Sequence, residues 1–217
     1  MDFSFATRVL NQMLALIIAL IVSEVAQAYM AKKQGDDTAE REGRLTLNPI
    51  PHLDPVGTIL FPLIGSMLGG FIFGWAKPIP VNTRNLVDPK WSPVKIAASG
   101  PIAMLLLSTL ALGGQLAIGN VAEGSPLIAF SRLFENMVFL SAFLALFHLL
   151  PIYPLAGGVL LSTLLPYDMR QKYESIVIPY GFFIIIGLML VGAFRILAVG
   201  AQFWIGISYM LLNPLFA

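Results

Sequence analysis

One carboxylate, that of Glu24, lies inside a long apolar run near the amino terminus, next to the polar side chains of Ser23 and Gln27. A charged side chain within a membrane helix costs at least about 2.5–3.5 kcal/mol, so it indicates a functional site by default. Ser23 and Gln27 are four residues apart and share one helix face, with Glu24 beside it. Two simpler interpretations stay open. Glu24 could snorkel to the interface near Lys32 and Lys33, and the two neutral side chains could make interhelical hydrogen bonds.

The chain offers few other groups for catalysis or metal binding. It has no cysteine, which excludes thiolate chemistry and disulfides, and it has two histidines, His52 and His148. His148, in "LFHLLPIYPLAGG", is a lone histidine on an apolar helix, a type that is usually packed and hydrogen-bonded. His52 and Asp54, in "NPIPHLDP", form a conceivable metal-binding pair, but an H-x-D spacing in a loop is weak evidence. Arg195 is expected to snorkel or to pair, and we assign it no chemistry.

The composition indicates an integral membrane protein. Of the 217 residues, 57% are hydrophobic and 12% are charged, and the mean hydropathy is +0.81. A soluble domain of this length needs far more polar surface. The net charge of +1 provides no basic field for nucleic acid. The first apolar run is too long for a signal peptide, and no small-residue cleavage site follows it, so we predict a retained membrane helix.

We predict an all-α polytopic membrane protein with about six transmembrane helices, organised as one domain over residues 1–217. A bilayer core about 30 Å thick needs roughly 20 apolar residues of helix. Windows that come close to this length are residues 9–30, 57–75, 94–118, 134–150, 176–194 and 196–212. Little more than Arg195 separates the last two, so a tight hairpin and one broken element remain as alternatives. The 13 lysine and arginine residues fall seven and six on the two sides of this topology, so the positive-inside rule does not orient it.

Three connecting segments carry further information. Residues 31–55 hold most of the charge, with acids and bases interspersed. Residues 76–93 include "KPIPVN", whose alternating prolines exclude helix and favour an edge strand or a polyproline-like run. Residues 151–158, "PIYPLAGG", predict a broken helix at membrane depth. Such irregular backbone is tolerated only where protein or a water-filled cavity surrounds it.

Four stretches together resemble, in order and spacing, the compact bacterial site-2 protease family of intramembrane zinc metallopeptidases. They are "GDDTAEREGRLTLNPIPHLDPVGTILFP", "FGWAKPIPVNTRN", "IAASGPIAMLLL" and "ALFHLLPIYPLAGG", and the similarity extends from about residue 10 to residue 170. The resemblance implies an H-E-x-x-H motif on the first core helix, an Asp in an L-D-G segment as third zinc ligand, and an Asn eight residues before that Asp. The two histidines would bind one metal ion from one helix face, and the glutamate would activate its bound water.

This sequence departs from that pattern at nearly every position that the chemistry needs. Glu24 matches the general-base glutamate, but the histidine positions are Ser23 and Gln27, the aspartate position is Ala156 and the asparagine position is His148. A hydroxyl, a primary amide and a methyl group cannot replace two imidazoles and a carboxylate as zinc ligands. Without a metal ion, water keeps a pKa near 15.7 rather than about 7. We therefore expect no zinc and no other cofactor, and we expect Glu24 to be structural or vestigial.

The resemblance also implies a retained scaffold, with a short extended hairpin after the second helix. The edge of this hairpin could bind an unwound substrate by strand addition, which needs no metal. The substrate-binding residues would then be Pro78, Ile79, Pro80, Val81 and Asn82. The resulting hypothesis is a non-catalytic homologue in the bacterial inner membrane. It would bind transmembrane segments of client proteins or regulate an active family member, with the lipid bilayer as its surroundings and without nucleic acid.

Two alternatives come from other classes of protein. An active intramembrane peptidase would need an atypical metal set such as Glu24, Gln27 and His148. One carboxylate, one amide and one imidazole make a weak zinc site. A small transporter would also contain broken helices and intramembrane carboxylates, but no inverted repeat is visible in the sequence.

Overall fold

The computed structural model describes residues 3–67, 72, 74–119, 121–122, 124–153 and 155–216. These residues form helices and connecting segments, and no strand occurs among them. The α-helices are α1 (Phe3–Lys33), α2 (Thr38–Arg41), α3 (Phe61–Met67), α4 (Trp91–Ile118), α5 (Ile128–His148), α6 (Ala156–Leu164), α7 (Tyr167–Leu190) and α8 (Phe194–Phe216). Short 3-10 or π-helical turns are η1 (Ile50–His52), η2 (Pro55–Leu60) and η3 (Thr83–Asn85).

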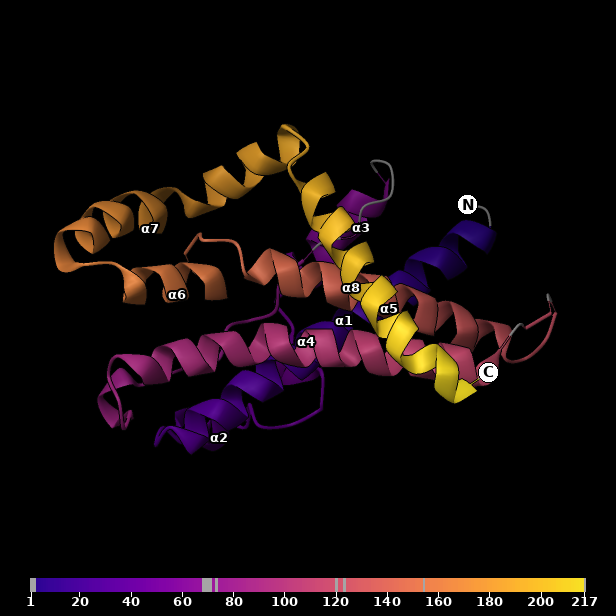
Figure 1. The fold of residues 1–217 in the computed structure, drawn as a ribbon, viewed down its shortest axis with the longest axis horizontal. Coiled ribbons are helices and arrows are strands. Elements are labelled where there is room, and N and C mark those ends of the chain that lie inside the picture. Colours follow the sequence, from indigo (N-terminus) through magenta and orange to yellow (C-terminus); the bar gives the residue numbers. More distant parts are fainter. Residues whose placement is uncertain are drawn as a thin grey trace.

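Five of these helices are long and apolar enough to cross a membrane, namely α1 over Ala6–Lys33, α4, α5, α7 and α8. The protein is therefore an all-α polytopic integral membrane protein, as predicted. The helices α7 and α8 are separate and are joined by a turn over residues 191–193 (Figure 1). The last two apolar windows are thus two separate helices, which diverge at an angle from the turn (Figure 1) and do not lie side by side as in a tight hairpin.

The second predicted span, residues 57–75, is wrong. Residues 57–67 of this window belong to a shorter apolar helical stretch, Pro55–Ser66 followed by Met67. Residues 72, 74 and 75 are not helical. Residues 68–71 and 73 lie outside the described part of the chain. The backbone N–H of Trp75 donates to the carbonyl oxygen of Gly57 at 3.2 Å, whereas a straight helix would separate these residues by about 27 Å. The chain returns to Gly57 because that position has no side chain: a Cβ there would lie 2.3 Å from the Trp75 Nε1.

The centre of the fold is a packed group of three helices, α1, α4 and α5, which α8 crosses (Figure 1). Ala15, Ala19 and Ala142 are fully buried in it, and small side chains let membrane helices approach closely. A hydroxyl group adds an interhelical bond, since Ser108 on α4 donates to the carbonyl oxygen of Val138 on α5 at 2.6 Å. This group provides the rigid base on which the cavity described below is built.

The predicted break is present between α5 and α6, where the described residues 149–153 and 155 are not helical, whereas residues 156–158 of the predicted range begin α6. After the break, α6 and α7 form a pair in which α6 packs on α4 of the central group and α7 lies on the far side of α6 (Figure 1). Glycines of this pair pack on the backbone of the break. A Cβ at Gly157 would lie 2.1 Å from the carbonyl oxygen of Leu149, and one at Gly181 would lie 2.4 Å from that of Tyr153. These two glycines therefore pack directly on part of the irregular backbone, whereas Leu149, Pro151 and Tyr153 of the break are exposed.

Residues 74–82, called the 74–82 segment below, contain neither helix nor strand. The expected extended hairpin is therefore wrong for the described residues. Positions 78 and 80 are prolines, which have no backbone N–H and cannot complete a strand ladder. Single contacts hold the segment instead. The N–H of Lys77 donates to the carbonyl oxygen of His52 at 2.9 Å, and the N–H of Asn82 donates to Asp36 Oδ2 at 2.7 Å.

Asp36 fastens the end of this segment to the end of α1. Its side chain is fully buried. Its carboxylate accepts hydrogen bonds from the backbone and hydroxyl of Thr38, from the N–H of Asn82 and from the side-chain amide of Asn85. Burial works to raise the pKa of this carboxyl group, but the hydrogen bonds from Thr38, Asn82 and Asn85 outweigh burial and hold the pKa below its ordinary value. Asp36 is therefore a charged anchor that connects two parts of the chain distant in sequence.

Candidate functional site

A cavity of about 610 Å³ lies where α1, the 74–82 segment, α4, α7 and the break between α5 and α6 meet. Most of the side chains on its wall are apolar. The candidate residues on the wall are Ser23, Glu24, Gln27, His148 and Ala156. The fold thus brings together all five positions that the sequence singled out on α1, α5 and α6.

The 74–82 segment forms one side of this cavity. Pro78, Ile79 and Val81 line it, whereas Pro80 and Asn82 lie on the same segment without being among the lining residues. Three of the five residues predicted to bind substrate therefore lie at the cavity.

Glu24 is paired with Arg44, a residue that the sequence analysis did not single out. A guanidinium nitrogen of Arg44 lies 3.3 Å from Glu24 Oε2, and the exposed fractions of the two side chains are 5% for Arg44 and 11% for Glu24. The same guanidinium donates to the carbonyl oxygens of Lys77 and Pro78. A buried carboxylate needs a partner to offset its lost hydration, and Arg44 provides it.

The interpretation that Glu24 snorkels toward Lys32 and Lys33 is wrong. The Nζ of Lys32 lies 2.6 Å from Glu40 Oε1, and the Nζ of Lys33 lies over the ring of Tyr29, 4.8 Å from its centroid. Both lysines therefore have partners of their own near the end of α1.

The sequence contains only a weak signal for Arg44, which is one of 13 basic residues. It directly follows Gly43, whose φ of +70° lies in the left-handed region that glycine favours. This turn follows α2 and begins the loop that carries Arg44 to Glu24.

Ser23 and Gln27 are bonded to each other rather than to another helix. Gln27 Nε2 donates to Ser23 Oγ at 3.3 Å, within α1. The helix α4 passes so close that a Cβ at Gly100 would lie 2.5 Å from Ser23 Oγ and 2.7 Å from Gln27 Nε2. The glycine of the "SGP" block therefore lets α4 pack directly on these two side chains, and the expected interhelical hydrogen bond is replaced by close packing.

His148 is a packed and hydrogen-bonded histidine, as expected for a lone histidine on an apolar helix. Its Nδ1 lies 2.8 Å from the carbonyl oxygen of Leu144, one turn earlier in α5. Its ring meets that of Phe147 edge-on, with centroids 5.7 Å apart. The tautomer with a proton on Nδ1 follows from this hydrogen bond, so Nε2 is the nitrogen left for other contacts.

The residues around the cavity do not fit a zinc ion. Zinc in proteins is bound by cysteine sulfur, histidine nitrogen and carboxylate oxygen, usually by four ligands or by three and a water. Of the lining residues, Glu24 and His148 are of these types, and Glu24 is paired with Arg44. No group of three or more His, Cys, Asp or Glu residues that could hold a metal ion occurs within the described ranges.

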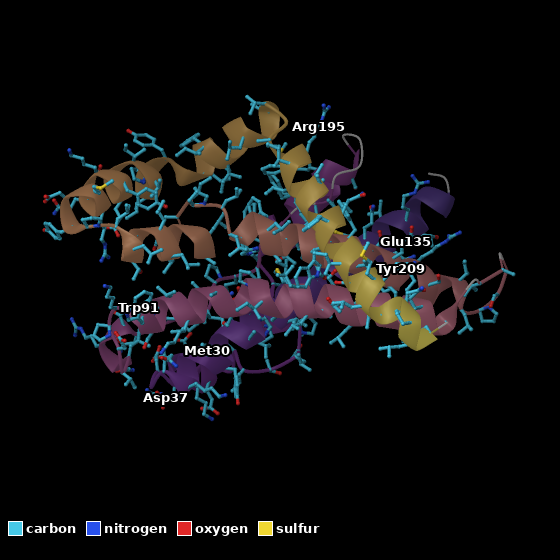
Figure 2. The ribbon with its side chains drawn as sticks, viewed as in Figure 1. Met30, Asp37, Trp91, Glu135, Arg195 and Tyr209 are labelled. Atoms are coloured by element: carbon cyan, nitrogen blue, oxygen red, sulfur yellow. The ribbon has the colours of Figure 1, made fainter. Side chains whose placement is uncertain are left out.

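The other conceivable metal pair, His52 and Asp54, makes local hydrogen bonds. His52 Nε2 lies 2.8 Å from the carbonyl oxygen of Thr46. Asp54 Oδ1 accepts from the backbone N–H groups of Val56 and Gly57, at 3.0 and 2.6 Å, and so caps η2. These two side chains therefore order the loop between α2 and α3. Arg195 lies at the turn between α7 and α8, away from Met30, Asp37 and Trp91 (Figure 2), and it does not line the cavity.

Acidification is expected to destabilise the protein through His52. Burial lowers the pKa of His52 from its ordinary value of 6.5, the hydrogen bond with Thr46 opposes this, and the positive charge of Arg44 lowers the pKa further. The unfolded chain therefore binds a proton at higher pH than the folded chain, so the free energy of unfolding falls as the pH drops below about 6.5. The free energy of unfolding stops falling at the pH at which His52 is also protonated in the folded protein. Thermal unfolding between about pH 7.5 and pH 5 measures this slope, and His52→Gln should reduce it. Equal slopes in both proteins would contradict the prediction.

Comparison with known proteins identifies two relatives. No family model matches the sequence, and no solved structure matches it. A protein of Bacillus subtilis (strain 168) named "Putative zinc metalloprotease YwhC" is 40% identical over 188 residues, which cover 82% of this chain and 81% of the relative. A protein of Mycolicibacterium smegmatis named "Putative zinc metalloprotease Rip2" is 29% identical over 178 residues, which cover 82% of this chain and 65% of the relative.

The similarity to YwhC extends over most of both chains. The four sequence blocks that resemble intramembrane metallopeptidases each contribute residues to the wall of one cavity, among them Phe61, Ile79, Ala97 and His148. On these grounds, the chain belongs to the site-2 protease family.

Proposed function

We propose that this protein is a non-catalytic site-2 protease homologue of the bacterial inner membrane. It binds transmembrane segments of client proteins or regulates an active relative. The observation that carries the proposal is the set of side chains at the cavity. Where the family resemblance places zinc ligands, this chain has Ser23, Gln27 and Ala156, and all three lie on the cavity wall.

The contacts of Glu24 also support a role without hydrolysis. A general base has to lie within hydrogen-bond reach of the group that it deprotonates. Glu24 Oε2 instead contacts Arg44 at 3.3 Å, and Arg44 in turn contacts the backbone of the 74–82 segment. The carboxylate at the general-base position is therefore engaged in holding the structure together.

The size and chemistry of the cavity suit a short unwound stretch of a membrane segment. A transmembrane helix of about 20 residues is about 30 Å long. A cavity of about 610 Å³ falls in the range of roughly 300–1,000 Å³ that is typical of small ligands. An unwound stretch exposes backbone groups that need partners in lipid. Gln27 and His148, on a mostly apolar wall, are groups that could provide them.

Photo-crosslinking in lipid vesicles tests this proposal. A photoreactive residue is placed at Ile79, on the cavity wall, and in a control protein at Leu110, which is exposed on α4. The added probe is a synthetic Leu/Ala transmembrane peptide with a central Gly-Pro pair. The same preparation is assayed for peptide cleavage and, by elemental analysis, for zinc. We expect more cross-linking from position 79 than from position 110, no cleavage and no stoichiometric zinc.

The second candidate function is an active peptidase with an atypical metal set. One observation favours it, since Glu24, Gln27 and His148 line the same cavity. This hypothesis predicts one bound zinc that is lost in His148→Ala, and cleavage that both a chelator and Glu24→Gln abolish. That result would replace the proposal. If cross-linking from position 79 were no stronger than from position 110, client binding would have to be removed from the proposal.

A further inference from the structure

Arg44 contacts two separate parts of the chain with one guanidinium group. It lies in the loop after α2, contacts Glu24 on α1 at 3.3 Å, and donates to the carbonyl oxygens of Lys77 and Pro78, the latter at 3.1 Å. A guanidinium has five donors in a rigid plane, so it can make such contacts at the same time. Arg44 thereby connects α1 to the 74–82 segment.

The burial of this ion pair makes its geometry hard to change. Arg44 is 5% exposed and Glu24 is 11% exposed, and a charge left without its partner in such surroundings is strongly disfavoured. Lys32 and Lys33, the nearest cations on α1, are engaged with Glu40 and Tyr29. The described basic residues of α1 therefore do not replace Arg44 as the partner of Glu24.

The part of the 74–82 segment that Arg44 contacts has few other fixed contacts, and one of them comes from Glu24 itself, whose carboxylate accepts a hydrogen bond from the backbone N–H of Ile79. The N–H of Lys77 bonds to His52 and the N–H of Asn82 bonds to Asp36. Positions 78 and 80 between them are prolines without an N–H. The stretch between these two bonds carries Ile79 and Val81 on the cavity wall. Arg44 binds this stretch at its start.

We infer that Arg44 is a positioning residue that holds the 74–82 segment against the cavity, with Glu24 as its buried counter-charge. In this chain, the carboxylate at the general-base position anchors Arg44. Breaking the pair releases the stretch around Ile79 from the cavity wall. The role of this contact in client binding rests on the proposed function. Its role in holding the 74–82 segment in place does not.

Thiol labelling tests this inference directly, because the chain has no cysteine of its own. A single cysteine at Ile79 reports on the segment, and one at Ala142, which is fully buried in α5, reports on the whole fold. Maleimide labelling rates are measured in detergent, without any client, in the otherwise unchanged protein and in Arg44→Gln. We expect Arg44→Gln to raise the rate at position 79 about tenfold or more, because losing a hydrogen bond to a charged group shifts a local opening equilibrium by about that factor. The rate at position 142 should stay the same.

Further variants separate positioning from general stability. Glu24→Gln should raise the rate at position 79 less than Arg44→Gln does, because the contacts with the carbonyl oxygens remain. Glu24 also accepts a hydrogen bond from the backbone N–H of Ile79, so the double variant should raise the rate at position 79 at least as much as Arg44→Gln does. Arg44→Lys should restore part of the protection, because an ammonium group lacks the planar fork. The matched control is Arg41→Gln, which removes an exposed arginine paired with Asp37 and should change neither rate.

Two results would overturn the inference. One is an unchanged labelling rate at position 79 in Arg44→Gln. The other is an equal rise at positions 79 and 142, which would show that Arg44 stabilises the whole fold and does not position the segment. Failure of the peptide to cross-link would remove the proposed function but not this inference, because the labelling uses no client.

Discussion

Replacing Arg44 with methionine is expected to lower the free energy of unfolding by about 3–5 kcal/mol. The substitution leaves the Glu24 carboxylate buried without a counter-charge, and it removes the donor from the carbonyl oxygens of Lys77 and Pro78. Methionine keeps much of the length of the side chain, so the loss comes from charge and hydrogen bonding more than from an empty space. Denaturant unfolding in a mild detergent, followed by circular dichroism, measures the change.

The double variant Glu24→Gln with Arg44→Met is the control for this prediction. A neutral amide at position 24 removes the unpaired charge, so the double variant should recover most of the stability that Arg44→Met loses. Arg41→Met changes an exposed arginine and should alter the free energy of unfolding by no more than about 0.5 kcal/mol. If the double variant were no more stable than Arg44→Met, the cost would not come from the unpaired carboxylate.

Replacing Gly157 with alanine is expected to lower the free energy of unfolding by about 1–3 kcal/mol, although alanine is the better helix former. A Cβ at this position would lie 2.1 Å from the carbonyl oxygen of Leu149 and 2.4 Å from that of Leu150. Both atoms belong to the backbone, so no change of rotamer relieves the contact. The break between α5 and α6 has to move, and with it His148 and Ala156 at the cavity. Thermal unfolding in detergent measures the loss.

Gly187 provides a matched control in a helix of the same protein. A Cβ at Gly187, in α7, would meet nothing within 4 Å. Gly187→Ala should therefore raise the free energy of unfolding by up to about 1 kcal/mol through helix propensity alone. The difference between the effects of Gly157→Ala and Gly187→Ala on the free energy of unfolding isolates the contact of α6 with the break. If both stabilised the protein equally, the packing of Gly157 on Leu149 would be wrong.

The pair formed by Glu24 and Arg44 changes the interpretation of an acidic residue inside a membrane helix. Such a residue indicates a functional site by default, and the family resemblance places Glu24 at the general-base position. In this structure, the carboxylate contacts Arg44, and Ser23 and Gln27 beside it bond to each other under Gly100 of α4. Ser23, Glu24 and Gln27, which the resemblance matches to a catalytic motif, contact Arg44 and α4 in this structure and so connect α1 to α4 and the 74–82 segment.

The sequence by itself determined the class of protein and the places where its helices break. Hydropathy over roughly 20 residues is a sum over neighbours and needs no knowledge of tertiary contacts, so the windows around α1, α4, α5, α7 and α8 were predicted correctly. Proline and glycine interrupt helices through local geometry, and the break between α5 and α6 followed from "PIYPLAGG" for that reason. The assignment of Glu24, His148 and Ala156 to family positions also rests on order and spacing, and it stays a prediction.

Tertiary structure decided what depends on contacts between distant residues. Residues 57–75 are apolar enough for a span, but Trp75 returns to bond with Gly57, and hydropathy does not register a reversal of the chain. The burial of Glu24 in an apolar run already required a partner for its charge, because unpaired charge in a membrane is costly. Which of the 13 basic residues approaches it depends on how the loop after α2 folds back. Only the fold shows that this residue is Arg44, 20 positions along the chain.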